Sequence, residues 1–292
     1  MNMYVSEYLI GVDGGGTGTR VRLANREGTQ LGQGESGPSG LGLGISKAWA
    51  AVTAAINAAF ASAGLPPAWP GQCAIGLGMA GVHNRDWAAA FLAADPGFAA
   101  LRLDTDGYTT LLGAHAGQAG VIIAIGTGSV GQALLPDGSG REVGGWGFPS
   151  GDEASGGWIG LAAMNHIERV LDGRRAASPF TEELMEACGS TRERVQVWLG
   201  HATQTRFAAL APIVVRHAGS DAVARDILTR AGQEIAEMVG ALDPDGALPL
   251  ALCGGLGAPL RRYLPPALLA RSIVPYGDAA TGALRMIEST VH

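Results

Sequence analysis

The sequence predicts an α/β protein with two domains of the same plan, each a mixed sheet flanked by helices. Two observations predict this fold class. A Gly/Thr turn after an apolar run occurs twice, and each copy leads into alternating helical and strand-like segments. The length of 292 residues is sufficient for about two domains with ample cores.

The two turns keep a constant spacing along the chain. Gly16-Thr17-Gly18-Thr19 and Gly126-Thr127-Gly128-Ser129 lie 110 residues apart. The spacing persists to the next turn, because Glu27-Gly28 corresponds to Asp137-Gly138. A register shared over strand, turn, strand and turn favours a duplicated hairpin over two ordinary turns in a glycine-rich chain.

The first half predicts three antiparallel strands over residues 9–36, joined by the glycine turns. Helices at 47–63, 87–94 and 109–116 and strands at 73–79 and 100–103 follow. Residues 117–120 are the expected boundary, because the second hairpin begins directly after them.

The second half repeats this plan with more helix. We expect helices at 153–171, 181–188, 191–199, 207–217, 222–242, 260–269 and 279–288, the sixth broken by prolines, and strands at 248–253 and 273–274. The expected domains are therefore 1–118 and 119–292, with the terminal helix able to pack back on the first domain.

Composition excludes several classes of protein. Hydrophobic residues make up 47% and charged residues 16%, as in a globular chain, and no apolar run reaches the length of a membrane span. The net charge is −6 without a basic block, which argues against nucleic acid as a partner. The three widely separated cysteines and the lack of a basic leader indicate a reducing, cytoplasmic location.

Lys47 is the only lysine in the chain. A P-loop needs a lysine in its GxxxxGK[ST] motif, and a protein-kinase fold needs a strand lysine on the phosphates. Neither can be built here. Phosphate binding must therefore come from backbone amides, hydroxyl groups and a metal ion.

The repeated turns suit phosphate binding. Glycines let backbone N–H groups approach a ligand closely, and Thr and Ser hydroxyls add donors. We therefore expect the turn Gly16-Thr17-Gly18-Thr19 to form one phosphate loop. The second phosphate loop is then Gly126, Thr127, Gly128 and Ser129.

Two acidic positions are candidates for chemistry. Asp13 directly precedes the first phosphate loop, where a carboxylate would repel phosphate unless Mg²⁺ lay between them. Asp104 and Asp106 lie at a strand–helix junction, where either fits a helix N-cap. Gly107 indicates close approach of a ligand, which favours Asp106 as the functional residue.

Two further glycine-rich segments predict ligand contacts. Gly144-Gly145-Trp146-Gly147, followed by Asp152, fits a sugar-facing loop with exposed amides and a carboxylate that accepts sugar hydroxyls. Asp152 fits a helix cap as well. Gly254 and Gly255 end a strand, where a flat ring such as adenine can lie against bare backbone.

Other site types fit poorly. Gly76-Leu77-Gly78 and Gly126-Thr127-Gly128 begin GxGxxG patterns, but neither opens a helix in a βαβ unit as a dinucleotide site requires. No GxSxG motif occurs, and the six histidines do not cluster at metal-ligand spacing. We expect His166 to be structural.

Taken together, these motifs resemble the N-acetylglucosamine kinases, part of the wider group of BadF/BadG-type ATPases with the actin–hexokinase–Hsp70 fold. The resemblance covers essentially the whole chain in order, and its most specific part is the Gly144–Gly147 and Gly151-Asp152-Glu153 segment. It implies two actin-like (ribonuclease H-like) domains with the active site in the cleft between them.

The resemblance implies roles position by position. Asp13 resembles the residue that holds Mg²⁺ through water, and Asp106 the catalytic base. Gly14–Thr17 and Gly126–Ser129 resemble the phosphate loops, and Gly254-Gly255 the adenosine motif. The implied sugar-site residues are Asp106, Thr127, Gly145, Trp146, Gly147 and Asp152.

The expected function is ATP-dependent phosphorylation of the 6-hydroxyl of N-acetylglucosamine, with ATP and Mg²⁺ as cofactors. The expected partner is a small amino sugar, without nucleic acid or membrane, and a homodimer is allowed. Family members carry Gly-Pro-x-Asn, whereas Gly40 replaces that Asn here, so a glucosamine kinase stays an alternative.

Two other classes stay open. An activator ATPase of the BadF type needs cluster-ligating cysteines near the second phosphate loop, and none occurs between Cys73 and Cys188. A sugar-sensing regulator needs a DNA-binding segment before the first loop, where only eight residues precede Leu9.

Overall fold

The chain divides into two compact units, described here from a computed structural model that covers residues 6–291. The first unit runs through Ala119 and resumes at Pro275, and the second spans Gly120–Val274. Both are built on a sheet of five strands. The predicted α/β class with mixed, helix-flanked sheets is confirmed.

The two sheets have the same topology. The strand order is β3-β2-β1-β4-β5 in unit 1 and, read from the other edge, β8-β7-β6-β9-β10 in unit 2. In each sheet the first three strands pair antiparallel, and the remaining neighbours pair parallel. The duplicated spacing in the sequence therefore corresponds to a duplicated sheet.

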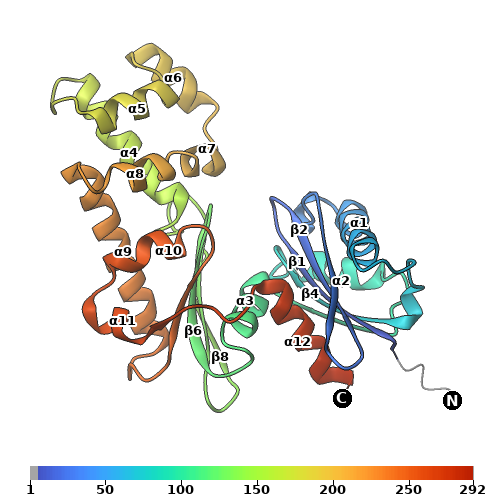
Figure 1. Cartoon of the computed structure of the whole chain (residues 1–292). Coiled ribbons are helices and arrows are strands. Elements are labelled where there is room, and N and C mark those ends of the chain that lie inside the picture. The colour runs from blue at the N-terminus through green and yellow to red at the C-terminus, as the bar shows by residue number, and fades with distance from the viewer. Residues whose placement is uncertain (1–5, 292) are drawn as a thin grey trace. The chain divides into compact units, whose positions relative to one another are not determined.

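Unit 1 contains the elements predicted for the first half of the chain and one from its end (Figure 1). The strands are β1 (Tyr8–Gly14), β2 (Thr19–Asn25), β3 (Gln30–Ser36), β4 (Cys73–Met79) and β5 (Ala100–Asp104), and the helices are α1 (Ile45–Ser62), α2 (Arg85–Ala93), α3 (Asp106–Ala114) and α12 (Ala279–Val291). Short 3₁₀ turns lie at Leu41–Leu43 and Pro70–Gln72.

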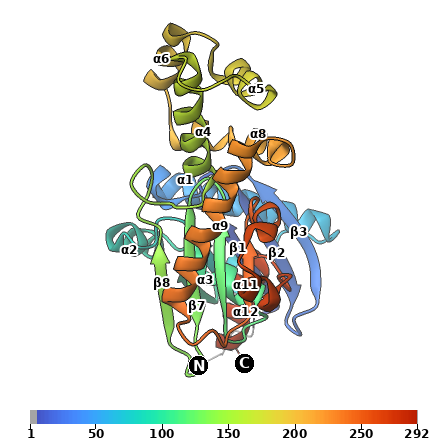
Figure 2. The same cartoon turned by 90° about the vertical axis from the view of Figure 1, so that its left-hand side faces the viewer.

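Unit 2 carries more helix, as predicted (Figures 1 and 2). Its strands are β6 (Gly120–Ile125), β7 (Ser129–Leu134), β8 (Gly140–Gly144), β9 (Leu250–Cys253) and β10 (Ser272–Ile273). Its helices are α4 (Gly156–Leu171), α5 (Pro179–Cys188), α6 (Arg192–Gly200), α7 (Gln204–Ala208), α8 (Ala211–His217), α9 (Ala222–Leu242), α10 (Gly257–Leu260) and α11 (Pro266–Arg271), with a 3₁₀ turn at Arg261–Tyr263.

Two elements of unit 2 differ from the sequence expectation. No strand is predicted over 140–144, yet β8 pairs with β7 there, which completes the three-stranded copy of β1–β3. The helix expected over 207–217 is two helices, α7 and α8, separated at Ala209 and Leu210. Pro212 occupies the first turn of α8, where its missing N–H costs nothing.

The core of unit 1 lies between the sheet and α1. Val52, Ile56 and Phe60 of α1 are buried against Ile10 and Val12 of β1 and their neighbours. The predicted apolar positions of this helix therefore face the sheet. Burying side chains of this size contributes roughly 1.5–3 kcal/mol each.

Helix α12 covers the opposite face of the same sheet at very short range. A side chain at Gly11 would collide with the carbonyl of Ala280, and one at Gly76 with the carbonyl of Ala283. Gly282 of α12 lies equally close to the Thr109 carbonyl of α3. The bare glycine backbones therefore allow the end of the chain to pack into unit 1 (Figure 1).

Candidate functional site

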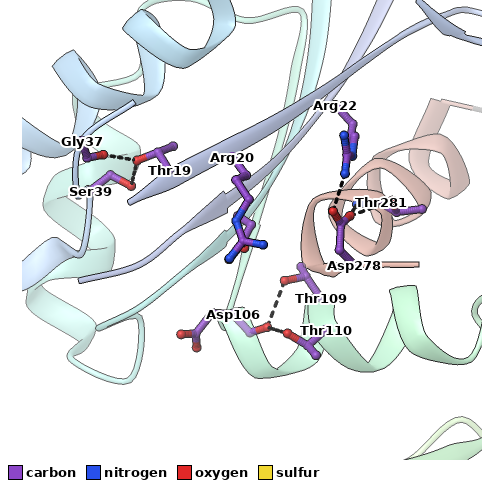
Figure 3. A network of polar contacts seen from close by, with 11 residues as sticks. Thr19, Arg20, Arg22, Gly37, Ser39, Asp106, Thr109, Thr110, Asp278 and Thr281 are labelled. Atoms are coloured by element: carbon purple, nitrogen blue, oxygen red, sulfur yellow. Dashed lines mark hydrogen bonds and ion pairs between the residues drawn. The ribbon is translucent and has the colours of Figure 1, made fainter. Parts of the chain in front are cut away.

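The β1–β2 turn of unit 1, the first predicted phosphate loop, is tied to the chain after β3. The amide of Gly15 donates to the Gly18 carbonyl at 3.0 Å, and the Gly15 carbonyl accepts from both Ser39 and Gly40 N–H at 3.0 Å. The hydroxyls of Thr19 and Ser39 are hydrogen-bonded to each other at 2.7 Å (Figure 3). The turn is therefore held from behind by residues 39–40.

Individual glycines of this turn have different reasons to be glycine. A Cβ on Gly14 would lie 2.5 Å from the Ser39 hydroxyl, so packing excludes a side chain there. A Cβ on Gly16 would have no atom within 4 Å, and both Gly16 and Thr17 are exposed. Packing requires Gly14, whereas Gly16 leaves its backbone open to a ligand.

Asp13 ends the buried part of β1 beside Arg20, whose Nε lies 3.6 Å from its Oδ2. Burial is the main reason that the pKa of Asp13 is raised from 3.8 to about 6, and the charges of Asp106 and Asp278 add to it. Arg20 opposes this shift. In such surroundings a cation next to the carboxylate would stabilise its ionised form.

Asp106 is the first residue of α3 and is not its N-cap. Thr105 occupies the cap position, where its Oγ1 accepts from the Tyr108 amide at 3.0 Å. Asp104 Oδ1 accepts from the Thr105 amide at 2.8 Å. The capping role considered for either aspartate thus belongs to Thr105, because the threonine lies between them.

The backbone of Asp106 is firmly held. Its carbonyl accepts from the hydroxyls of Thr109 at 3.2 Å and Thr110 at 2.7 Å (Figure 3). Its carboxylate accepts from the Gly107 amide at 3.0 Å. Its charge is also among the causes of the raised pKa of Asp13, so the predicted base and the predicted metal residue belong to one electrostatic cluster.

The β6–β7 turn of unit 2, the second predicted phosphate loop, is bound to the first turn of α4. The amides of Gly156 and Gly157 donate to the carbonyls of Gly126 and Thr127, at 2.8 and 3.1 Å. Ser129 Oγ donates to the Glu153 carbonyl at 2.6 Å. Since these helix amides are already engaged, a phosphate here must use the amides and hydroxyls of the loop itself.

Asp152 lies against this loop. The residue is 6% exposed, and a Cβ on Gly128 would lie 2.8 Å from its Oδ2. Ser155, not Asp152, caps α4 by accepting from the Trp158 amide at 3.1 Å. The structure therefore brings together Gly128 and Asp152, and it leaves Asp152 without the capping role.

Gln204 is the first residue of α7, and no sequence pattern marks it as a functional residue. Its Nε2 donates to Asp152 Oδ2 at 2.5 Å and to the Thr127 carbonyl at 3.1 Å. The side-chain amide of Gln204 thus links the second predicted phosphate loop to the carboxylate of Asp152. No motif surrounds Gln204, so only its tertiary contacts identify it.

In the predicted sugar loop, residues 144–147, three glycines have a positive φ. Gly144, Gly145 and Gly147 have φ of 73°, 70° and 88°, a region that disfavours side chains. The Gly145 amide donates to the Ser129 carbonyl at 3.1 Å, which fixes the loop to β7. Trp146 is 86% exposed, so its ring is available for contact with a ligand.

The predicted adenosine motif follows β9, next to β6. Gly254 has φ of 79°, and a Cβ there would collide with the Ile125 carbonyl, whereas Gly255 has open space. The Leu256 amide donates to the same carbonyl at 3.1 Å. Gly254 is therefore needed by the fold, and its close approach places the motif directly behind Gly126.

Other site types gain no support from the residues that the structure describes. Among residues 6–291 no group of three or more His, Cys, Asp or Glu side chains is arranged to hold a metal ion, and all three cysteines are buried. His166 packs beside Phe180, with ring centres 6.4 Å apart. Within the same residues no helix is both long and apolar enough to cross a bilayer.

The family to which the chain belongs is shown by a match to a family model. Residues 10–249 match the model of the BadF/BadG/BcrA/BcrD ATPase family. The chain belongs to this family. The predicted resemblance and its fold are thereby confirmed.

Alignments with individual relatives cover most of both chains. Glucosamine kinase GspK of Vibrio cholerae is 32% identical over 98% of this chain and 97% of its own. An N-acetyl-D-glucosamine kinase of Dictyostelium discoideum is 25% identical over 85% of each chain. The crystal structure of a candidate N-acetylglucosamine kinase from Chromobacterium violaceum superposes with a TM-score of 0.93, at 53% identity over 97% of this chain and 99% of that one.

Proposed function

We propose that this chain is an ATP-dependent amino-sugar kinase that transfers the γ-phosphoryl group to the 6-hydroxyl of N-acetylglucosamine. The observation that carries the proposal is the packing of Asp152 against Gly128, with Gln204 hydrogen-bonded to Asp152 and to the carbonyl of the neighbouring Thr127. A phosphoryl transferase needs its acceptor group beside its phosphate-binding backbone. In unit 2 the carboxylate of Asp152, which is predicted to bind the sugar, lies directly against the turn that is predicted to bind phosphate.

The relatives support the same chemistry. The curated relatives are named for glucosamine and N-acetyl-D-glucosamine phosphorylation, and the alignments cover most of each chain. Both names describe kinases of amino sugars. We therefore assign an amino sugar as substrate and ATP as phosphoryl donor.

The proposed roles follow from the positions of the residues. Asp106 accepts the proton of the sugar hydroxyl, and its backbone is held by Thr109 and Thr110 so that the carboxylate keeps its orientation. The amides of Gly15, Gly16 and Thr17 and those of Thr127 and Gly128 bind phosphate oxygens. Asp152 accepts sugar hydroxyls through the carboxylate oxygen that Gln204 does not use.

Asp13 fits a magnesium site. Its carboxylate is largely buried beside Asp106 and Asp278, and these surroundings raise its pKa, so a dication would relieve an unfavourable charge. We assign Asp13, directly or through water, as the residue that holds Mg²⁺. When bound, Mg²⁺ neutralises charge on the phosphates.

The identity of the amino sugar is testable by a panel. The amides of the 144–147 loop and the exposed Trp146 suit the carbonyl and methyl of an acetamido group better than an ammonium. We expect kcat/KM to fall from N-acetylglucosamine to glucosamine to glucose in a coupled ADP-release assay. If glucosamine leads, as the name of the Vibrio cholerae relative favours, Asp152 reads an ammonium and glucosamine kinase is the function.

The same assay tests the remaining classes. A lack of ADP release with every sugar would contradict the kinase and favour a sugar-sensing regulator. A purified protein with the colour of an iron–sulfur cluster would favour a dehydratase activator. The burial and separation of the three cysteines favour a colourless protein.

A further inference from the structure

A cavity in unit 2 lies between α4 and α9, remote from the glycine loops. Its volume is about 380 Å³, and its polar lining is Asn165, His166, Arg169, Arg175, Asp226 and Arg230. Helices α4 and α9 lie side by side along it (Figures 1 and 2). Arg169 lies 13 residues beyond Gly156, the residue bonded to the phosphate loop, which is roughly 20 Å along the helix.

The lining is positively charged in an acidic protein. Three of the 20 basic residues of the chain lie in this lining with one carboxylate, Asp226, and the charge of a second, Asp221, acts on His166 from the start of α9. Such a local excess attracts anions.

The three arginines differ in their partners. Arg230 Nε lies 3.1 Å from Asp226 Oδ2, and its guanidinium lies 5.6 Å from the centre of the Trp158 ring, which together orient it. Arg169 and Arg175 have no carboxylate within ion-pair distance among residues 6–291, and Arg175 reaches only the Arg174 carbonyl at 3.4 Å. Two guanidinium charges of the cavity are therefore uncompensated.

Neutral hydrogen-bonding groups complete the lining. Burial is the main cause that lowers the pKa of His166, so at neutral pH its ring is uncharged and offers one donor and one acceptor. The amide of Asn165 adds two more donors. The cavity thus combines planar cations with uncharged donors.

We propose that this cavity binds a small phosphorylated metabolite. Guanidinium groups match the tetrahedral phosphate with paired N–H donors, and phosphate accepts several donors at once. The volume lies near the lower end of the range of ligand pockets, roughly 300–1,000 Å³, which suits a phosphate ester of monosaccharide size. The proposal does not depend on the kinase assignment.

Calorimetric titration of the full chain tests it with inorganic phosphate, an amino-sugar 6-phosphate, ADP and citrate. We expect Arg169→Gln combined with Arg175→Gln to weaken binding of the phosphate compound that binds the cavity at least tenfold. Arg174→Gln removes one positive charge next to the cavity, where Arg174 pairs with Asp172 instead, and should change little. The substituted residues Arg169, Arg174 and Arg175 are all exposed, so the variants should fold.

A second variant distinguishes binding in the cavity from binding at the β6–β7 turn. In Gly126→Val the cavity binding should persist, whereas binding at the predicted phosphate loop should weaken at least tenfold. The tightest binder then identifies the source of the phosphate as free ion, sugar ester or nucleotide. Equal binding by the double variant and the parent, or binding of citrate without any phosphate compound, would overturn the proposal.

Discussion

Nε2 of Gln204 lies 2.5 Å from Oδ2 of Asp152, and the two residues are 52 positions apart in the chain. This hydrogen bond orients the carboxylate of Asp152, a buried residue that is 6% exposed and that lies against Gly128. Because Gln204 also donates to the Thr127 carbonyl, it couples the geometry of two predicted ligand-binding segments. Gln204 is therefore a positioning residue of the proposed reaction.

Gln204→Leu should lower kcat/KM for the sugar by about 10- to 100-fold. A hydrogen bond to a charged group contributes about 1.5–3 kcal/mol, and leucine leaves the Asp152 carboxylate without this donor. Steady-state kinetics with varied sugar measure the effect, which should fall mainly on the sugar KM. Gln233→Leu, an exposed change on α9, is the control, and equal kinetics in both variants would exclude the role.

Asp106→Asn should reduce kcat by roughly 10²–10⁴-fold while sugar and nucleotide still bind, because a positioned general base contributes about that much. The asparagine amide keeps the shape of the side chain. The hydrogen bonds from Thr109 and Thr110 go to the carbonyl of residue 106, so the substitution does not remove them. Kinetics and binding titration should be measured on one preparation. Asp104→Asn is the matched variant, and a larger loss there would transfer the role to Asp104.

Gly126→Val should raise the Kd for nucleotide at least tenfold without loss of stability. A Cβ at residue 126 meets no atom within 4 Å, so the fold tolerates it, whereas a branched side chain occupies the space in which phosphate must approach. Thermal melting and nucleotide titration check the two halves of this statement. An unchanged Kd in a variant that melts normally would make the β6–β7 turn purely structural.

Asp13→Asn should stabilise the metal-free protein at pH 8, by about 3 kcal/mol at most. The pKa of Asp13 rises from 3.8 unfolded to about 6 folded, so the ionised form destabilises the folded state fully above pH 6. This cost decreases between pH 6 and pH 4 and vanishes below, where both states are protonated.

Denaturant unfolding at pH 8 and pH 4 with the metal chelated measures the gain from this variant. Glu27→Gln, at an exposed turn, should show no comparable gain. A gain of equal size at both pH values would mean that charge burial at Asp13 is not its cause.

Local patterns determined much of the fold. Strand β4 and helix α9 have the predicted bounds, Cys73–Met79 and Ala222–Leu242, because apolar periodicity reports directly on burial. The repeat of 110 residues predicts duplicated sheets because hairpin geometry depends on nearby turn residues. The sequence does not predict strand β8, because Gly140–Gly144 is exposed or half-buried and lacks alternation, and the strand forms by pairing with β7.

The sequence by itself determined the turns, the order of elements and the candidates Asp13, Asp106 and Asp152, since each depends on residues close in the chain. Tertiary structure alone decided that Asp152 packs on Gly128, that Gln204 holds both segments, and that α12 packs on Gly11 and Gly76 of unit 1. These contacts join residues distant in sequence. Their geometry depends on how helices and sheets pack, and no local periodicity records it.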